Sequence, residues 1–129
     1  MSSIFTKIIN GEIPSYKIYE NEKVYAFLDI HPATRGHTLV VPKIEVDYFA
    51  DVPADYATAL MTAAQTISKA LDQATGCKRT QLIIAGRDVP HTHIHLIPSE
   101  NIGDIRTSDT LTFSDEEMED IQEKIIAFL

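Results

Sequence analysis

Apolar residues that recur every three or four positions predict two helices. The longer stripe lies between Pro53 and Gly76 and comprises Ala57, Leu60, Ala64, Ile67, Leu71 and Ala74. Proline near the beginning and glycine at the end are typical of helix boundaries. The second stripe comprises Met118, Ile121, Ile125 and Phe128, and it follows the spacing of a capping box at Ser114 and Glu117. The pattern therefore predicts one long helix over residues 53–76 and a C-terminal helix over about 114–128.

Short apolar runs bounded by turn residues predict the strands. They cover residues 16–19, 24–30, 38–41, 81–85 and 91–97. A further apolar run at residues 4–9 stops at Asn10 and Gly11, which predicts a short helical turn. No repeat or low-complexity linker divides the chain. We therefore expect a single α+β domain over residues 1–129, with an antiparallel sheet of about five strands.

Composition and charge narrow the classes of partner and location. The chain has 129 residues, of which 44% are hydrophobic, enough for one core. Eleven Lys and Arg against nineteen Asp and Glu give a net charge of −8, which argues against binding duplex nucleic acid. No apolar run approaches the roughly 20 residues that cross a bilayer, and the N-terminus lacks the layout of a secretory signal. We expect a cytoplasmic protein with no membrane partner, and a free thiol at its one cysteine, Cys77.

Three of the five histidines, His91, His93 and His95, alternate along one predicted strand. Alternate residues of a strand point to the same face, so the three imidazoles are expected to share a face, about 6.5 to 7 Å apart. The intervening residues, Thr92 among them, are expected to point into the core. Three interpretations of the row stay open at this point. They are packed or solvated histidines, a zinc site, and a site where imidazole attacks phosphorus beside a second ring that acts as acid or base.

The segment around these histidines resembles a known family signature. Residues 91–97, HTHIHLI, are similar to the His-φ-His-φ-His-φ-φ pattern, φ being apolar, of the histidine triad (HIT) family of nucleotide hydrolases and transferases. Residues 4–14, 26–32 and 35–43 are similar to the N-terminal half of that family, in the same order. The resemblance covers roughly residues 3–98. It implies a HIT-like fold, a homodimer and a purine nucleotide or nucleotide conjugate as ligand.

The resemblance also implies roles for individual residues. His93 matches the nucleophile that attacks the α-phosphate, and His95 matches the partner that contacts the phosphate oxygens. His91 matches the supporting histidine behind them, and His37 matches a further neighbour of this group. Asp29 matches the carboxylate that takes the ribose hydroxyls. The residues that match the apolar cleft around the base are Ile4, Phe5, Ile8, Phe27 and Ile30.

Two departures from the family pattern concern metal and packing. Ser3 and Thr6 stand where some bacterial members have two cysteines. In those members the cysteines hold a structural zinc together with histidines that match His37 and His91, so we expect no metal here. Thr92 stands in a slot that is normally apolar, which a β-branched residue tolerates in a strand.

A third departure is the shortened loop at residues 85–90, before the triad. Arg87 stands where the family usually has Gln, and Asp88 stands where it has Ser or Thr. Both are expected to contribute to substrate binding, next to the phosphate or the leaving group. Arg87 is able to hold phosphate, whereas Asp88 repels it unless the two side chains pair with each other.

We therefore expect a HIT hydrolase that cleaves purine nucleoside phosphoramidates, or related nucleotidyl conjugates, through a nucleotidyl-His93 intermediate. No metal or organic cofactor is expected. Two alternatives stay open. One is hydrolysis of a dinucleoside polyphosphate, and the other is a nucleotide-binding or partner-binding module with little turnover.

Overall fold

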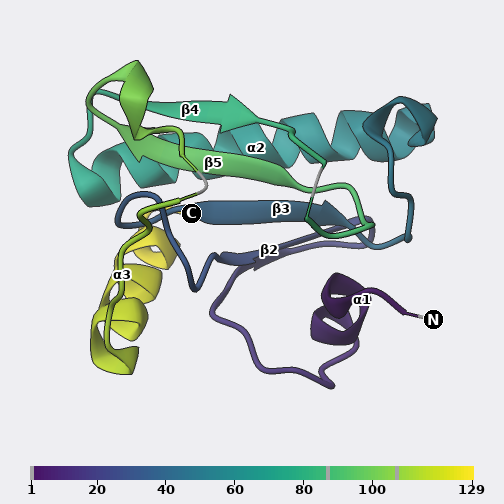
Figure 1. The fold of residues 1–129 in the computed structure, drawn as a ribbon, viewed down its shortest axis with the longest axis horizontal. Helices are drawn as coiled ribbons and strands as arrows, with labels where there is room; N and C mark the ends of the chain where they lie inside the picture. Colours follow the sequence, from purple (N-terminus) through teal and green to yellow (C-terminus); the bar gives the residue numbers. More distant parts are fainter. Residues whose placement is uncertain (1, 87, 107) are drawn as a thin grey trace.

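The structure is a computed structural model that describes residues 2–86, 88–106 and 108–129. At its centre lies a five-stranded antiparallel sheet in the order β1-β2-β3-β5-β4 (Figure 1). The strands are β1 (Lys17–Glu20), β2 (Val24–Leu28), β3 (Thr38–Pro42), β4 (Arg79–Ile83) and β5 (Ile94–Ser99). The predicted α+β class with a five-stranded antiparallel sheet is therefore confirmed.

The described residues form three α-helices and two short 3-10 turns. These are α1 (Ile4–Ile9), η1 (Phe49–Asp51), α2 (Ala54–Thr75), η2 (Ile102–Asp104) and α3 (Asp115–Ala127). α2 ends at Gly76, whose φ of 70° lies in the left-handed region that favours glycine. Ser114 and Glu117 form the predicted capping box at the start of α3. In the part of the chain that the structure describes, no helix is long and apolar enough to cross a membrane.

The two faces of the sheet carry separate apolar clusters. Figure 1 shows α2 running along one face, behind β4 and β5. Val40 and Ile94, paired across β3 and β5, belong to the larger cluster with residues of α2 and α3. Leu39, the neighbour of Val40, points to the opposite face and packs in a smaller cluster with Phe5 of α1. Because His95 is paired with Leu39, the face that α1 covers is also the face of the histidines.

The predicted strand over residues 91–97 is wrong at its start, because β5 begins at Ile94. The Thr92 N–H donates to the carbonyl of Val46 over 2.7 Å, so this stretch of backbone is held by the loop after β3. The Thr92 hydroxyl donates to the same carbonyl, also over 2.7 Å. A hydrogen-bonding side chain therefore fits a slot that is apolar in the family pattern.

Candidate active site

A cavity of about 300 Å³ is lined by residues of α1, β2, β3, β5 and the loop before β5. Its apolar lining includes the predicted cleft residues, with Phe5, Ile8 and Phe27 buried and with Ile4 and Ile30 exposed. Its polar lining comprises Ser15, Asp29, His31, Asp88, His93 and His95. The structure thus brings the predicted cleft together with the predicted nucleophile, its phosphate partner and the predicted ribose carboxylate.

His93 has one ring nitrogen bonded to the main chain, which leaves the other for a ligand. Its Nδ1 lies 2.8 Å from the carbonyl oxygen of His91, and a carbonyl only accepts, so Nδ1 carries the hydrogen. The neutral ring therefore has its lone pair on Nε2. The Phe5 and His93 rings pack in a T-shaped arrangement, with the ring centroids 5.0 Å apart. These contacts hold the ring in the orientation and tautomer that a nucleophilic Nε2 requires.

The Asp88 carboxylate lies beside His93, the predicted nucleophile. Its Oδ1 is 3.2 Å from His93 Nε2, and 70% of its side chain is exposed. A carboxylate at this distance bonds to Nε2 only when the ring is protonated, because a nitrogen lone pair cannot bond to an acceptor. The structure therefore places Asp88 next to Nε2 of the predicted nucleophile, in the wall of the cavity. Its predicted companion, Arg87, lies outside the described residues.

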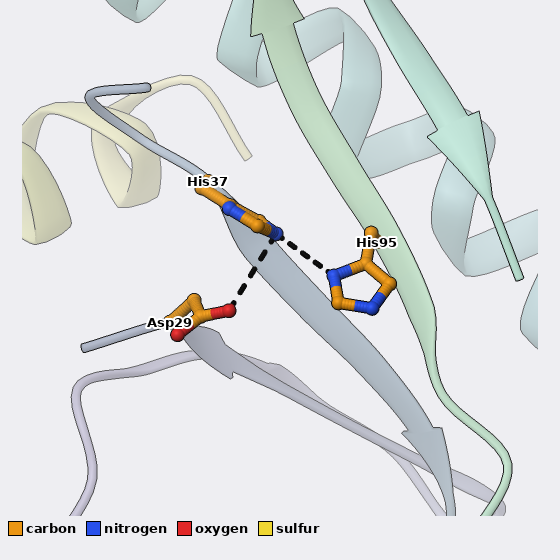
Figure 2. Close-up of side chains that lie close together, drawn as sticks. All are labelled: Asp29, His37 and His95. Carbon is orange, nitrogen blue, oxygen red and sulfur yellow. Dashed lines mark hydrogen bonds and ion pairs between the residues drawn. The ribbon is translucent and has the colours of Figure 1, made fainter. Parts of the chain in front are cut away.

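His37 is buried directly before β3, and its ring points towards His95 (Figure 2). Gly36 makes this turn possible, since its φ is 93° and a Cβ there would lie 3.1 Å from the Thr75 side chain. The Ala33 N–H donates to His37 Nδ1 over 2.9 Å. Burial, with His95 nearby, lowers the pKa of His37 to about 3. The ring is therefore neutral and carries its hydrogen on Nε2.

His95 accepts the hydrogen bond that His37 donates. His37 Nε2 and His95 Nδ1 are 2.9 Å apart, and the hydrogen between them belongs to His37. Burial, with His93 nearby, lowers the pKa of His95 to about 4, so this ring is neutral as well and has its hydrogen on Nε2. Figure 2 shows that this second nitrogen points away from His37. Because His95 lines the cavity, its Nε2–H is a donor for an anionic ligand.

Asp29 follows β2 and lies at the edge of the same group. Its Oδ1 accepts the His31 N–H over 2.8 Å, and its Oδ2 lies 3.6 Å from His37 Nε2. Burial raises the pKa of Asp29, although the hydrogen bond from the His31 N–H opposes the shift. The free capacity of its two oxygens to accept hydrogen bonds suits a pair of neighbouring hydroxyl groups.

Asp29, His37 and His95 also have the composition of a metal site, because their ligand atoms lie within 4.8 Å of one another. The hydrogen bonds of His37 argue against that use. A neutral histidine bound to metal through Nε2 carries its hydrogen on Nδ1, which normally donates to an acceptor. Here Nδ1 faces the Ala33 N–H, another donor. The arrangement fits a hydrogen-bonded pair of rings better than a metal centre.

His91 lies behind the cavity and does not line it. Its Nε2 is 2.9 Å from the Pro42 carbonyl, so Nε2 carries the hydrogen. Burial lowers the pKa of His91, and the neutral ring therefore accepts at Nδ1 from the Ser3 hydroxyl, 2.8 Å away. The Ser3 oxygen also accepts from the Thr6 N–H at the start of α1. His91 thus links α1 to the triad segment, which agrees with a supporting role.

His37 and His91 lie at opposite ends of β3, although the resemblance matches them to histidines that share a zinc in some bacterial members. His37 precedes β3, whereas His91 bonds to Pro42 at the other end of the same strand. Five residues of extended strand span about 16 Å, too far for a shared ligand. The residue that joins His91, Ser3 and Thr6 is Glu45. Its Oε1 accepts the Ser3 N–H over 2.6 Å and the Thr6 hydroxyl over 2.7 Å.

A family model described as the HIT domain matches residues 10–102, more than half of the chain. The chain belongs to the HIT family. It is 40% identical over 99 residues to the adenosine 5'-monophosphoramidase HNT1 of Saccharomyces cerevisiae, which is 76% of this chain and 63% of that relative. It is 34% identical over 113 residues to the adenylylsulfatase HINT3 of Arabidopsis thaliana, which is 84% of this chain and 57% of that relative. The matched segments thus span less than two thirds of each of these two relatives.

The HIT fold extends over nearly the whole chain. The crystal structure of a Hit-like protein involved in cell-cycle regulation from Bartonella henselae matches 99% of this chain and 97% of its own, with a TM-score of 0.86 and 32% identity. The family includes hydrolases of the kinds that the names of HNT1 and HINT3 state.

Two side chains of this HIT protein's site are missing from the sequence-based prediction. Ser15 lines the cavity, and its Oγ lies 2.9 Å from the Tyr25 hydroxyl. Glu45 joins the cluster around His91 from a loop after β3. Single polar residues in loops carry no periodic signal, so only the tertiary structure reveals them.

The buried neutral rings predict a loss of stability in mild acid. An unfolded imidazole has a pKa near 6.5, whereas folded His37 stays unprotonated down to about pH 3. Between these values the unfolded state binds more protons, so the free energy of unfolding falls as the pH falls, by about 1.4 kcal/mol per pH unit for one such histidine. The free energy of unfolding is measured with urea between pH 6 and pH 4.5 and plotted against pH. In His37→Gln, the slope of this plot should be lower than in the wild-type protein by about 1.4 kcal/mol per pH unit.

The matched control for this experiment is His31→Gln, since the His31 side chain is exposed. It should leave the slope of the wild-type protein unchanged. An equal slope in the wild-type protein and in His37→Gln would contradict a neutral, buried His37.

Proposed function

We propose that this HIT protein hydrolyses purine nucleoside phosphoramidates or related nucleotidyl conjugates through a nucleotidyl-His93 intermediate. The observation that carries the proposal is the hydrogen bond from His93 Nδ1–H to the His91 carbonyl, which leaves the Nε2 lone pair for a ligand in the cavity. The relationship to HNT1, named as an adenosine 5'-monophosphoramidase, supports the choice of substrate class.

In the first step, His93 Nε2 attacks the α-phosphorus, the Nε2–P bond forms and the P–N bond to the amine breaks. The Nε2 lone pair makes the attack, and the departing nitrogen takes up a proton that solvent delivers through the Asp88 carboxylate, 3.2 Å from Nε2. The amine leaves as a neutral molecule. The His95 Nε2–H donates to a phosphate oxygen and stabilises the charge that develops there.

In the second step, water attacks the phosphorus of the nucleotidyl-histidine and the Nε2–P bond breaks. The electron pair of that bond returns to Nε2, and a proton of the water passes through Asp88 to solvent. The products are a nucleoside monophosphate and the starting enzyme. Asp29 holds the ribose hydroxyls during both steps, and the apolar wall formed by Phe5, Ile8 and Phe27 contacts the base.

The position of Asp88 favours an amine leaving group over a phosphate. An exposed carboxylate 3.2 Å from the nucleophile repels an anionic leaving group and attracts a cationic or protonated one. Hydrolysis of a dinucleoside polyphosphate is therefore the weaker alternative. The other alternative is a module that binds nucleotide with little turnover. The next experiment distinguishes such a module from an enzyme.

His93→Asn should abolish the covalent route while the fold and nucleotide binding persist. Asparagine offers hydrogen bonds but no nucleophilic nitrogen, so turnover of an adenosine phosphoramidate should fall by on the order of 10³-fold or more. Acid-quenched wild-type protein should carry a nucleotidyl group that is absent from the variant. Turnover is measured with a chelator present, because the proposed route uses no metal.

The matched control is Cys77→Ser, which removes the one thiol of the chain, a nucleophile outside the cavity. It should keep full turnover and full labelling. Near-wild-type turnover in His93→Asn, or loss of wild-type activity in the chelator, would refute the mechanism.

Asp88→Ser should change the preference among leaving groups. Removing a charge about 4 Å from a leaving phosphate relieves repulsion of about 1 kcal/mol, a factor of about five in rate. The ratio of turnover on adenosine diphosphate or diadenosine polyphosphate to turnover on an amine conjugate should rise by this factor. Asp51→Ser, at an exposed carboxylate in η1, should leave the ratio unchanged. An equal change on all substrates would mean that Asp88 does not face the leaving group.

We also propose that the protein is a homodimer that pairs through β4. β4 is an edge strand, and a groove beside it is lined by residues of α2 and β4, among them the exposed Met61 and Leu82. Two copies related by a two-fold axis can join such edges into one continuous sheet.

In sedimentation experiments, Leu82→Glu should shift a wild-type dimer to monomer. Ile126→Glu, at an exposed apolar residue of α3, should remain dimeric, and a monomeric wild type would exclude the proposal.

A further inference from the structure

The segment that follows β5 contacts the turn that holds His37. The guanidinium Nη2 of Arg106 donates to the Ala33 carbonyl over 2.7 Å. The Leu111 N–H donates to the Pro32 carbonyl over 2.8 Å. Both donors lie beyond residue 102, where the match to the HIT family model ends. They are therefore features of this chain outside the part that the family model describes.

These two hydrogen bonds flank the N–H group that bonds to His37. The Pro32 carbonyl and the Ala33 N–H belong to one peptide group, so the bond from Leu111 polarises that group and strengthens the donation to His37 Nδ1. The Ala33 carbonyl, held by Arg106, belongs to the next peptide group. Ala33 itself is fully buried. Its backbone is thus held on both sides of the atom that directs the His37 ring.

We propose that Arg106 is a positioning residue for His95, acting through the backbone of Ala33 and the ring of His37. Arg106 holds the Ala33 backbone, the Ala33 N–H fixes the His37 tautomer, and His37 Nε2–H fixes His95 Nδ1 as an acceptor. The relay ends at the His95 Nε2–H, which the proposed function assigns to the phosphate. The last two rings of this relay are those drawn in Figure 2.

Arginine suits this role because it is itself held in place. Its Nη1 lies 4.0 Å from Asp104 Oδ1, and Asp104 Oδ2 accepts the N–H groups of Glu100 and Asn101. The short turn η2 therefore fixes the carboxylate that orients the guanidinium. A charge-assisted bond to a carbonyl is stronger than a neutral one. Arg106 does not line the cavity, so it acts on the position of His95 and not on the ligand directly.

The test compares Arg106→Leu, which removes the donor, with Arg106→Gln, which keeps a neutral donor, in the full-length protein. Lys23→Ala is the control, because it removes one cation from the β1–β2 turn, which lies beside Lys43 at the far end of β3 from the His37 turn. The first readout is turnover of an adenosine phosphoramidate. In Arg106→Leu, kcat should fall about tenfold with KM within about twofold of wild type, since misplacement of a phosphate donor affects the transition state more than binding. Arg106→Gln should lie between the two, and Lys23→Ala should equal wild type.

The second readout is independent of turnover. In protein labelled with ¹⁵N-histidine, NMR of the wild type should show His37 and His95 each as a single Nε2–H tautomer. In Arg106→Leu these signals should shift towards a mixture of tautomers. If the wild type turns over no phosphoramidate, the proposed function fails, whereas the NMR comparison still decides the role of Arg106.

Unchanged histidine signals in a folded Arg106→Leu would overturn the proposal, whatever its kcat. A rise in KM at constant kcat would also overturn it, because that result indicates a direct effect on binding. If Arg106→Leu fails to fold, Arg106→Gln decides. Wild-type signals together with wild-type kcat in that variant count against the proposal, and a partial change in both supports it.

Discussion

The hydrogen bond from the Ala33 N–H to His37 Nδ1 determines where the hydrogens lie in the pair of rings that follows. A backbone amide only donates, and it does not change its protonation state in the range of pH where proteins are folded. His37 therefore has one favourable neutral form, and so does His95. The His91 carbonyl fixes the other tautomer in His93. Because a carbonyl only accepts, it holds the hydrogen of that ring on Nδ1. Main-chain groups, which do not titrate, thus orient the imidazoles of this HIT site.

Local patterns are sufficient to predict the elements that depend on local interactions. α2 and α3 follow from their apolar stripes and from the capping box at Ser114, and their bounds agree with the prediction to within one residue at each end. The start of the triad segment does not follow from its pattern. Alternation predicts a strand there, but Thr92 bonds to Val46, which lies 46 residues away in the sequence. A partner at that distance leaves no trace in the spacing of apolar residues.

The residues of the site also divide into those that the sequence points to and those that only the tertiary structure reveals. The resemblance to the HIT family, and not the spacing of residues, points to the cleft and to His93 and His95, and these lie together in the cavity. It also points to His37 as a neighbour of this pair, and His37 bonds to His95 in the structure. Glu45 and Arg106 reach their partners from loops. Their contribution becomes visible only when the strands and the segments around them are placed in space.

The cover of the cavity, α1, has only six residues, and a helix of that length is not stable in isolation. Its attachment consists of the apolar contacts of Phe5 and Ile8 and of the hydrogen bond between Ser3 and His91, 88 residues apart in sequence. A ligand that touches both α1 and the triad therefore stabilises the docked helix. The rate at which the amide hydrogens of α1 exchange with solvent becomes a measure of occupancy, and it can be used to screen compounds without any knowledge of the reaction.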